Sequence, residues 1–252
     1  MKCPNCNETK HDVRAKFCRH CGAPLFNQDG IQQPLPLRIE YGNVFCTMTK
    51  YQGGKHGYTG TIEIPTYLDG QKVTAIGDYA FFGDSGLSSI TLPDTLTHIG
   101  ELAFSHCGFT EITIPDSVVM IGKLAFYECL NLSRLILSNS LVSISDEAFM
   151  GCRNLTKISI PPSVRRIGNM AFYNCKATSI IVPSTVESID CGAFVRSCDS
   201  EKPVSIVFPK KFLSKRVVLG FYGGHLGGPL KSSISIKDEN GNDINYEDLP
   251  DY

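Results

Sequence analysis

The sequence predicts a β-rich solenoid of stacked short repeats, preceded by a small module that folds around a metal ion. Three observations predict this arrangement. An Ile-Gly-x-x-Ala-Phe pattern returns every 22 or 23 residues through most of the chain. Each return leads to a short segment in which apolar residues alternate with polar ones, as they do in a half-buried strand. Four cysteines near the amino terminus form two Cys-x-x-Cys pairs, apart from the repeats.

The composition suits one large domain with a small appendage. The chain has 252 residues, of which 42% are hydrophobic, and a formal net charge of −1, so its bulk charge attracts neither nucleic acid nor anionic membrane. The first residues are polar and lack the apolar stretch of a signal peptide. No apolar run is long enough to span a bilayer. We therefore expect a cytoplasmic protein with no membrane insertion, and cell-surface exposure is the alternative.

The metal-binding module occupies residues 1–26. Tetrahedral Zn²⁺ takes four thiolates, and the two-residue gap lets both sulfurs of a pair reach one ion. A segment this short buries too little apolar surface to fold alone. Zinc binding would then supply the folding free energy, roughly 10–16 kcal/mol in comparable peptides. We expect one structural Zn²⁺, and a redox or disulfide role for the cysteine pairs is the alternative. The expected ligands are Cys3, Cys6, Cys18 and Cys21.

The same segment resembles the short zinc-ribbon modules of bacterial proteins. The resemblance lies in Cys-Pro-Asn-Cys at residues 3–6 and Phe-Cys-Arg-His-Cys-Gly-Ala-Pro-Leu at residues 17–25. Residues 1–26 hold five basic and two acidic side chains, and a zinc ion with four thiolates adds −2, which leaves +1. This weak charge argues against nucleic-acid binding, although a regulator acting on nucleic acid through the ribbon stays an alternative. Residues 27–37 contain two prolines and no period, and we interpret them as a linker.

The repeats run over residues 73–209 and number about six. Each contains Ala-Phe four residues after its isoleucine, and then, with small changes, Leu-x-x-Ile-x-Ile-Pro, whose apolar residues point inward and whose proline ends the strand. One unit cannot bury its apolar face alone, whereas stacked units share a continuous core. The aromatic residues of successive units should therefore form a spine. Its members are Phe81, Phe104, Phe126, Phe149, Phe172 and Phe194.

Self-similarity at 20–29 residues is typical of leucine-rich repeats. The pattern I-G-x-x-A-F-x-x-C-x-x-L-x-x-I-x-I-P-x-S-V resembles the BspA type, also found in Treponema, over about residues 58–209. The fold we expect is thus a small zinc ribbon plus a right-handed β-rich leucine-rich-repeat solenoid. It has a parallel β-sheet on one face and short turns or helical turns on the other. Residues 38–72 should form an N-terminal cap and first coil, and residues 210–252 a C-terminal cap with a hairpin.

Seven further cysteines need an explanation. Four of them stand three residues after a repeat phenylalanine, which predicts a ladder of buried thiols that behave as small hydrophobes. Metal binding or redox sensing by this ladder is the alternative. The ladder members are Cys107, Cys129, Cys152 and Cys175. The other three, Cys46, Cys191 and Cys198, we expect to be buried singly.

No catalytic motif stands out, because the chain lacks G-x-S-x-G, H-E-x-x-H and G-x-x-x-x-G-K-[ST], so we predict that it is not an enzyme. Solenoids use their extended faces to bind proteins. We predict a non-enzymatic scaffold for an unknown protein or peptide partner, and a solvated sheet without a partner is the alternative. The resemblance to the BspA type also implies a surface adhesin as a rival. The candidate contact residues are the outward positions Glu111, Thr113, Arg134, Ile136, Lys157, Ser159, Ser179 and Ile181.

Overall fold

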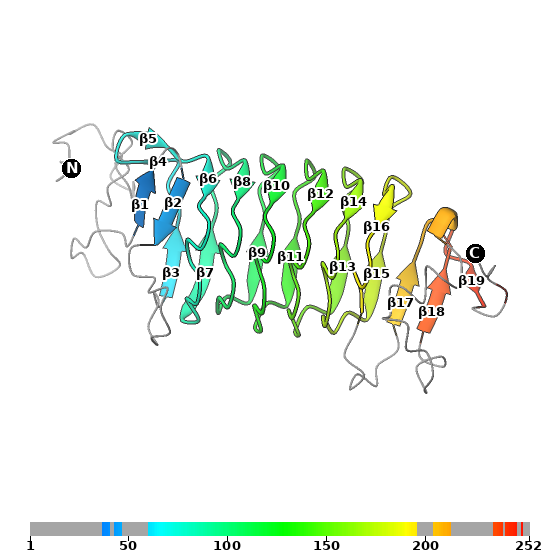
Figure 1. The fold of residues 1–252 in the computed structure, drawn as a ribbon. Helices are drawn as coiled ribbons and strands as arrows, with labels where there is room; N and C mark the ends of the chain where they lie inside the picture. Colours follow the sequence, from blue (N-terminus) through cyan, green and yellow to red (C-terminus); the bar gives the residue numbers. More distant parts are fainter. Residues whose placement is uncertain are drawn as a thin grey trace, which may run out of the picture.

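The computed structural model describes residues 37–40, 43–46, 60–195, 204–212, 234–238, 240–245 and 248. They form an elongated stack of coils, in which each repeat contributes one longer strand and one two-residue strand (Figure 1). The four expected zinc ligands, Cys3, Cys6, Cys18 and Cys21, and most of the expected linker lie outside these residues.

The longer strands stack in parallel along one side of the solenoid. Hydrogen-bonded ladders join β3 to β7, β9 to β11, and β13 through β15 and β17 to β18. These strands are β3 (Gly60–Glu63), β7 (Leu87–Thr91), β9 (Glu111–Thr113), β11 (Arg134–Ile136), β13 (Lys157–Ser159), β15 (Ser179–Ile181), β17 (Val204–Val207) and β18 (Ile234–Lys237). At the far end, β18 pairs antiparallel with β19 (Asp243–Ile244), and the Asn240-Gly241 turn lies between them.

The two-residue strands form a second parallel ladder, which we call the return ladder. Each pairs in register with the next, and the isoleucine of each faces the core. The members are β6 (Ala75–Ile76), β8 (His98–Ile99), β10 (Met120–Ile121), β12 (Ser143–Ile144), β14 (Arg166–Ile167) and β16 (Ser188–Ile189). An antiparallel hairpin of β1 (Leu37–Glu40) and β2 (Asn43–Cys46) extends this sheet, because β2 pairs with β6. Within the first coil, β4 (Tyr67–Leu68) pairs with β5 (Gln71–Lys72).

The expectation of helical turns opposite the longer strands is not met in the part of the chain that the structure describes. The helical turns that it contains are 3₁₀ turns beyond the repeats, η1 (Lys210–Phe212) and the turn that includes Asp248. The residue before each Ala-Phe has a left-handed φ of 52° to 69°, which interrupts any right-handed helix. In the first five repeats its amide donates to a carbonyl of the next coil, so stacking imposes the conformation. These residues are Tyr79, Leu102, Leu124, Glu147, Met170 and Gly192.

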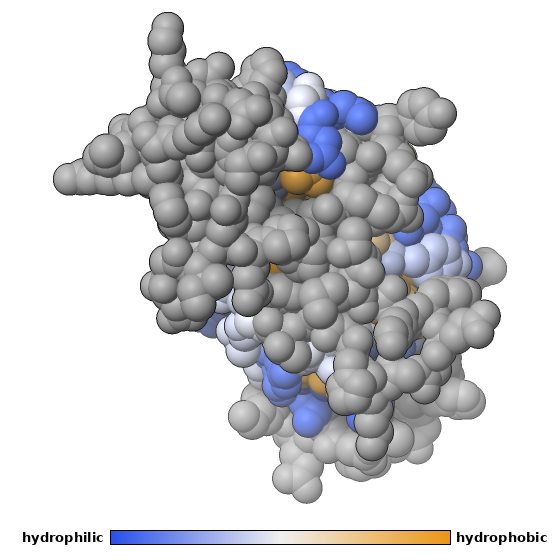
Figure 2. Space-filling model, turned by 90° about the vertical axis from the view of Figure 1, so that its left-hand side faces the viewer, coloured by the Kyte–Doolittle hydropathy of each residue, from blue (hydrophilic) through white to orange (hydrophobic). Residues whose placement is uncertain are grey.

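The core lies between the two ladders, and the phenylalanine spine expected there is confirmed. Six rings stack with centroids 5.0 to 5.6 Å apart and interplanar angles of 5° to 22°. All six are at most 1% exposed. Phe109 adds an edge-to-face contact to Phe104 and Phe126, where the second repeat is one residue shorter. In the end-on view of Figure 2, the visible described side chains are mostly hydrophilic, with small hydrophobic areas between them.

Candidate interaction surface

The structure brings the eight candidate contact residues together on one surface, which we call the strand face. Along the solenoid they form two rows. The first row is Glu111, Arg134, Lys157 and Ser179, and the second is Thr113, Ile136, Ser159 and Ile181. Seven of the eight are exposed and Ser179 is half-buried. The alternation that predicted them is confirmed, because the residue between the two rows points inward on every strand.

Charge on the strand face is uneven along the first row. The Nη1 atom of Arg134 lies 3.5 Å from Oε2 of Glu111, but the two side chains are 69% and 65% exposed. Solvent screening limits such a pair to about 1 kcal/mol or less. Lys157 on the next coil has no ion pair among the described residues. The row therefore presents one anion followed by two cations, and the second cation is not neutralised.

The second row carries the exposed apolar side chains of this face. Ile136 is 43% exposed and Ile181 is 50% exposed, with the polar Ser159 on the coil between them. Val207 of β17 lies in register with Ile181 and continues the row. Apolar and cationic side chains thus run side by side along the same three coils.

The return ladder presents a second surface that the sequence analysis did not single out. Val119, Met120 and Val142 are 40%, 47% and 55% exposed on adjoining coils. A strand of two residues shows no alternation, so the sequence carries little signal for this surface. The repeat pattern predicts short turns or helical turns on this side, whereas the structure has strands there.

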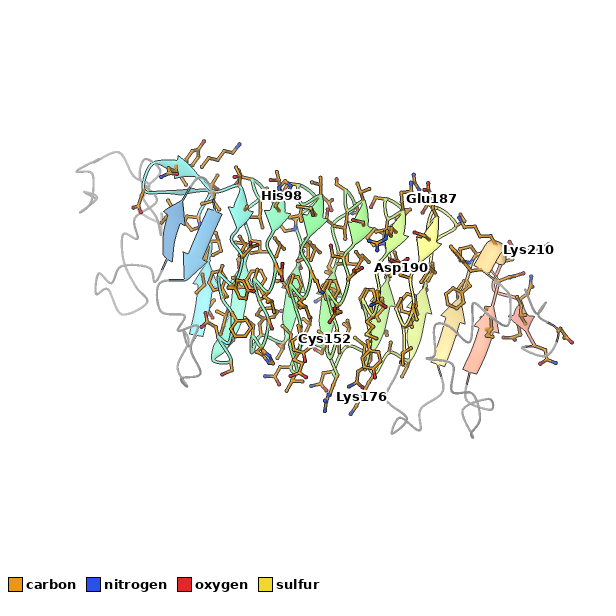
Figure 3. All side chains as sticks on the ribbon, viewed as in Figure 1. His98, Cys152, Lys176, Glu187, Asp190 and Lys210 are labelled. Carbon is orange, nitrogen blue, oxygen red and sulfur yellow. The ribbon has the colours of Figure 1, made fainter. Side chains whose placement is uncertain are left out.

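Charges beside this apolar patch neutralise one another. The guanidinium of Arg166 contacts both Asp146 and Asp190, one coil away on either side. Arg165 lies 3.8 Å from Glu187, which Figure 3 places at the upper edge of the stack, whereas Lys176 lies at the lower edge. The cations of the return ladder are therefore paired within the protein, unlike Lys157 on the strand face.

The cysteine ladder lies in the core, as the spacing predicted. Its four thiols are at most 2% exposed, and each donates to the carbonyl of the phenylalanine one coil earlier at 3.0 to 3.3 Å. Burial raises the pKa of Cys175 to about 12 and that of Cys152 well above its usual value. Since the thiolate is the reactive form, these features favour a packing role over redox sensing.

The three remaining cysteines were expected to be buried singly, and the structure describes the side chain of one of them, Cys191. Cys191 is exposed, so this expectation was wrong for it. It follows Ile189 by two positions, in the turn after β16. The side chains of Cys46 and Cys198 lie outside the described residues.

Among the described residues, no group of three or more His, Cys, Asp or Glu side chains is placed to hold a metal ion. No helix in that part of the chain combines the length and the apolar character needed to cross a membrane.

Comparison with known proteins gives one family match. Six copies of the BspA type leucine rich repeat region match residues 74–201. No curated protein sequence matches the chain.

Several solved structures are similar to the chain. A leucine rich repeat protein of T. pallidum, TpLRR, is 25% identical, with 68% of this chain and 67% of that chain covered and a TM-score of 0.42. A leucine-rich repeat protein from Bacteroides ovatus is 20% identical, with coverage of 84% and 67% and a TM-score of 0.37. The pneumococcal vaccine antigen PcpA is 23% identical, with coverage of 62% and 47% and a TM-score of 0.45.

Proposed function

Because the chain belongs to the BspA-type leucine-rich repeat family, we propose that it is a non-enzymatic interaction protein that holds a protein or peptide partner on its strand face. One observation carries this proposal. The strand face places exposed apolar side chains, Ile136 and Ile181, in line beside the cations Arg134 and Lys157. Interfaces combine buried apolar anchors with polar groups that fix orientation, and solenoids offer such surfaces over several repeats.

The proposal is tested by affinity capture from native lysate. The double variant Arg134→Glu/Ile136→Asp should lose the proteins that the wild-type chain captures, because it reverses a charge and makes an apolar contact polar. The matched control is Arg165→Glu/Val142→Asp, which makes the same kinds of change on the return ladder and should capture normally. Both variants alter exposed side chains and lose one exposed ion pair each, so both should stay folded and lose about 1 kcal/mol or less in the free energy of unfolding in urea. Undiminished capture by the strand-face variant would contradict the proposal.

We also propose that residues 1–26 form a zinc ribbon held by Cys3, Cys6, Cys18 and Cys21. Support comes from the two Cys-x-x-Cys pairs and the tetrahedral preference of Zn²⁺ for four thiolates. With no ligand position left open, the ion would be structural. Elemental analysis should find about one zinc per chain, and Cys6→Ser with Cys21→Ser should remove it. Less than about half a zinc ion per wild-type chain would overturn the zinc ribbon.

We propose that the protein is located in the cytoplasm. Membership of the BspA-type family supports a surface adhesin as the alternative function. The buried thiols do not decide between them, because their burial and raised pKa protect them from oxidation in either compartment. Protease treatment of intact cells followed by fractionation separates the two proposals. Digestion of the protein on intact cells would favour the adhesin, and protection until lysis would favour the cytoplasmic scaffold.

A further inference from the structure

The cations on the two faces of the solenoid differ in whether they form ion pairs within the protein. On the return ladder, Arg165 and Arg166 contact carboxylates of adjoining coils. On the strand face, Lys157 has no such contact in the described part of the chain, and Arg134 meets only the largely exposed Glu111. Lys157 is thus left to attract an external anion, and Arg134 can join it because solvent screens its exposed pair with Glu111. The strand face is therefore complementary to acidic side chains.

The coil spacing restricts the shape of a partner lying along the solenoid. Ring centroids on the coils that carry β11, β13 and β15 are 5.0 and 5.2 Å apart. Side chains on one face of an α-helix recur about every 5.4 Å, whereas those on one face of an extended chain recur about every 6.7 Å. Over two coil steps the side chains of a helix would move out of line with the coils by less than about 1 Å, and those of an extended chain by about 3 Å. The spacing therefore favours a helix.

The second row adds an apolar requirement. Ile136 and Ile181 are two coils apart, which corresponds to two turns of a helix, or seven residues. Arg134 and Lys157 are one coil apart, which corresponds to one turn. A matching helix would carry apolar side chains at i and i+7 and acidic side chains at i+1 and i+4. Those positions lie on adjoining stripes of one helix face.

We propose that the strand face binds an acidic amphipathic α-helix of a partner protein, lying along the solenoid axis. This inference rests on the proposed function and names the kind of partner. The acidic side chains of the helix pair with Arg134 and Lys157, and its apolar side chains cover Ile136 and Ile181.

The test uses the full chain and a fluorescent alanine-based helical peptide with leucines at i and i+7 and glutamates at i+1 and i+4. Binding is followed by fluorescence anisotropy. The control peptide has the same composition, with the glutamates moved to the opposite face. It should bind at least about tenfold more weakly. Binding of the first peptide should also weaken as salt is raised, because exposed charges are screened.

Two variants check the site. Arg134→Glu/Lys157→Glu should weaken binding of the glutamate peptide at least about tenfold and should gain binding to a peptide with lysines in place of the glutamates. Arg165→Glu/Arg166→Glu, the same change on the return ladder, should bind the glutamate peptide like the wild type. The gained binding would also show that the strand-face variant is folded.

Other outcomes would overturn the inference. Equal binding of the two acidic peptides would mean that no helical face is recognised. Displacement of the peptide by a single-stranded oligonucleotide at equal charge concentration would indicate a general anion surface instead. The inference fails alone if Arg134→Glu/Ile136→Asp abolishes partner capture while the peptide does not bind. The proposed function fails as well if that variant captures normally.

Discussion

The thiol of Cys129 donates a hydrogen bond to the backbone carbonyl of Phe104, one coil earlier, over 3.0 Å. That carbonyl also accepts from the amide of Cys107 in its own coil, at 3.1 Å. Cysteine is thus a spacer between coils next to the ring stack, small enough to fit and able to contact the carbonyl through a weak donor. The contact recurs on three other coils, in the pairs Cys107–Phe81, Cys152–Phe126 and Cys175–Phe149.

Replacing Cys129 should therefore lose packing energy without leaving the Phe104 carbonyl unpaired. Cys129→Ala removes a buried sulfur and one weak hydrogen bond, and the Phe104 carbonyl keeps its second donor. We expect a loss of about 1–2 kcal/mol in the free energy of unfolding, measured in urea. Cys191→Ala is the control, because Cys191 is exposed and its loss should cost less than about 0.5 kcal/mol. Equal effects of the two substitutions would contradict a packing role for the ladder.

Alkaline pH should destabilise the solenoid through the same thiols. Burial raises the pKa of Cys175 from 9.0 to about 12 in the folded chain. The folded state therefore keeps a proton that the unfolded state releases, so its stability is full below pH 9 and falls as pH rises toward 12. Each such thiol should cost roughly 1 kcal/mol per pH unit in that window.

The measurement is urea unfolding at several pH values between 8 and 11. Cys175→Ala is the control, because it removes one titrating thiol and should lose stability less steeply with pH than the wild type. Parallel curves for the two proteins would contradict a buried, protonated Cys175.

The repeat spacing allowed much of the solenoid to be predicted, because identical positions on stacked coils must meet. Phe126 could be placed in the spine, and Arg134 and Lys157 on one outward row, from spacing and alternation alone. The return ladder could not be predicted from the sequence, since a strand as short as Met120–Ile121 holds one inward residue and shows no alternation. Residues with a left-handed φ, such as Leu102, could not be predicted either, because no glycine marks these positions. The conformation of Leu102 is set by the hydrogen bond from its amide to the Lys123 carbonyl.

The phenylalanine spine should dominate the stability of the repeats. Phe126 stacks between Phe104 and Phe149 at 5.3 and 5.0 Å and is fully buried. Phe126→Ala should cost about 3–5 kcal/mol, since the stacked coils can close only part of the cavity. Phe126→Leu keeps most of the volume and loses the stacking, so we expect a cost of about 1–2 kcal/mol. Urea unfolding measures both, and a cost below about 1 kcal/mol for the alanine variant would be incompatible with the spine.

Two glycines at the same repeat position provide the sharpest test of how closely the coils stack. Gly83 and Gly151 both have a left-handed φ, at 79° and 78°, and each donates its amide to the next coil at 2.8 Å. A Cβ atom on Gly83 would meet no atom of the described residues within 4 Å, whereas one on Gly151 would lie 2.9 Å from Cγ of Glu128. Glu128 is itself held by His106, whose Nδ1 lies 3.5 Å from Oε2 of Glu128.

Alanine at the two positions should therefore differ in cost although the backbone strain is equal. Gly83→Ala should lose about 1 kcal/mol, the left-handed penalty less the entropy removed from the unfolded chain. Gly151→Ala should lose about 1 kcal/mol more, because Glu128 must move away from the new methyl group. Truncating that side chain in Gly151→Ala/Glu128→Ala should remove the excess, which a double-mutant cycle in urea would measure. Additive costs in that cycle would mean that the coils are not packed closely at this position.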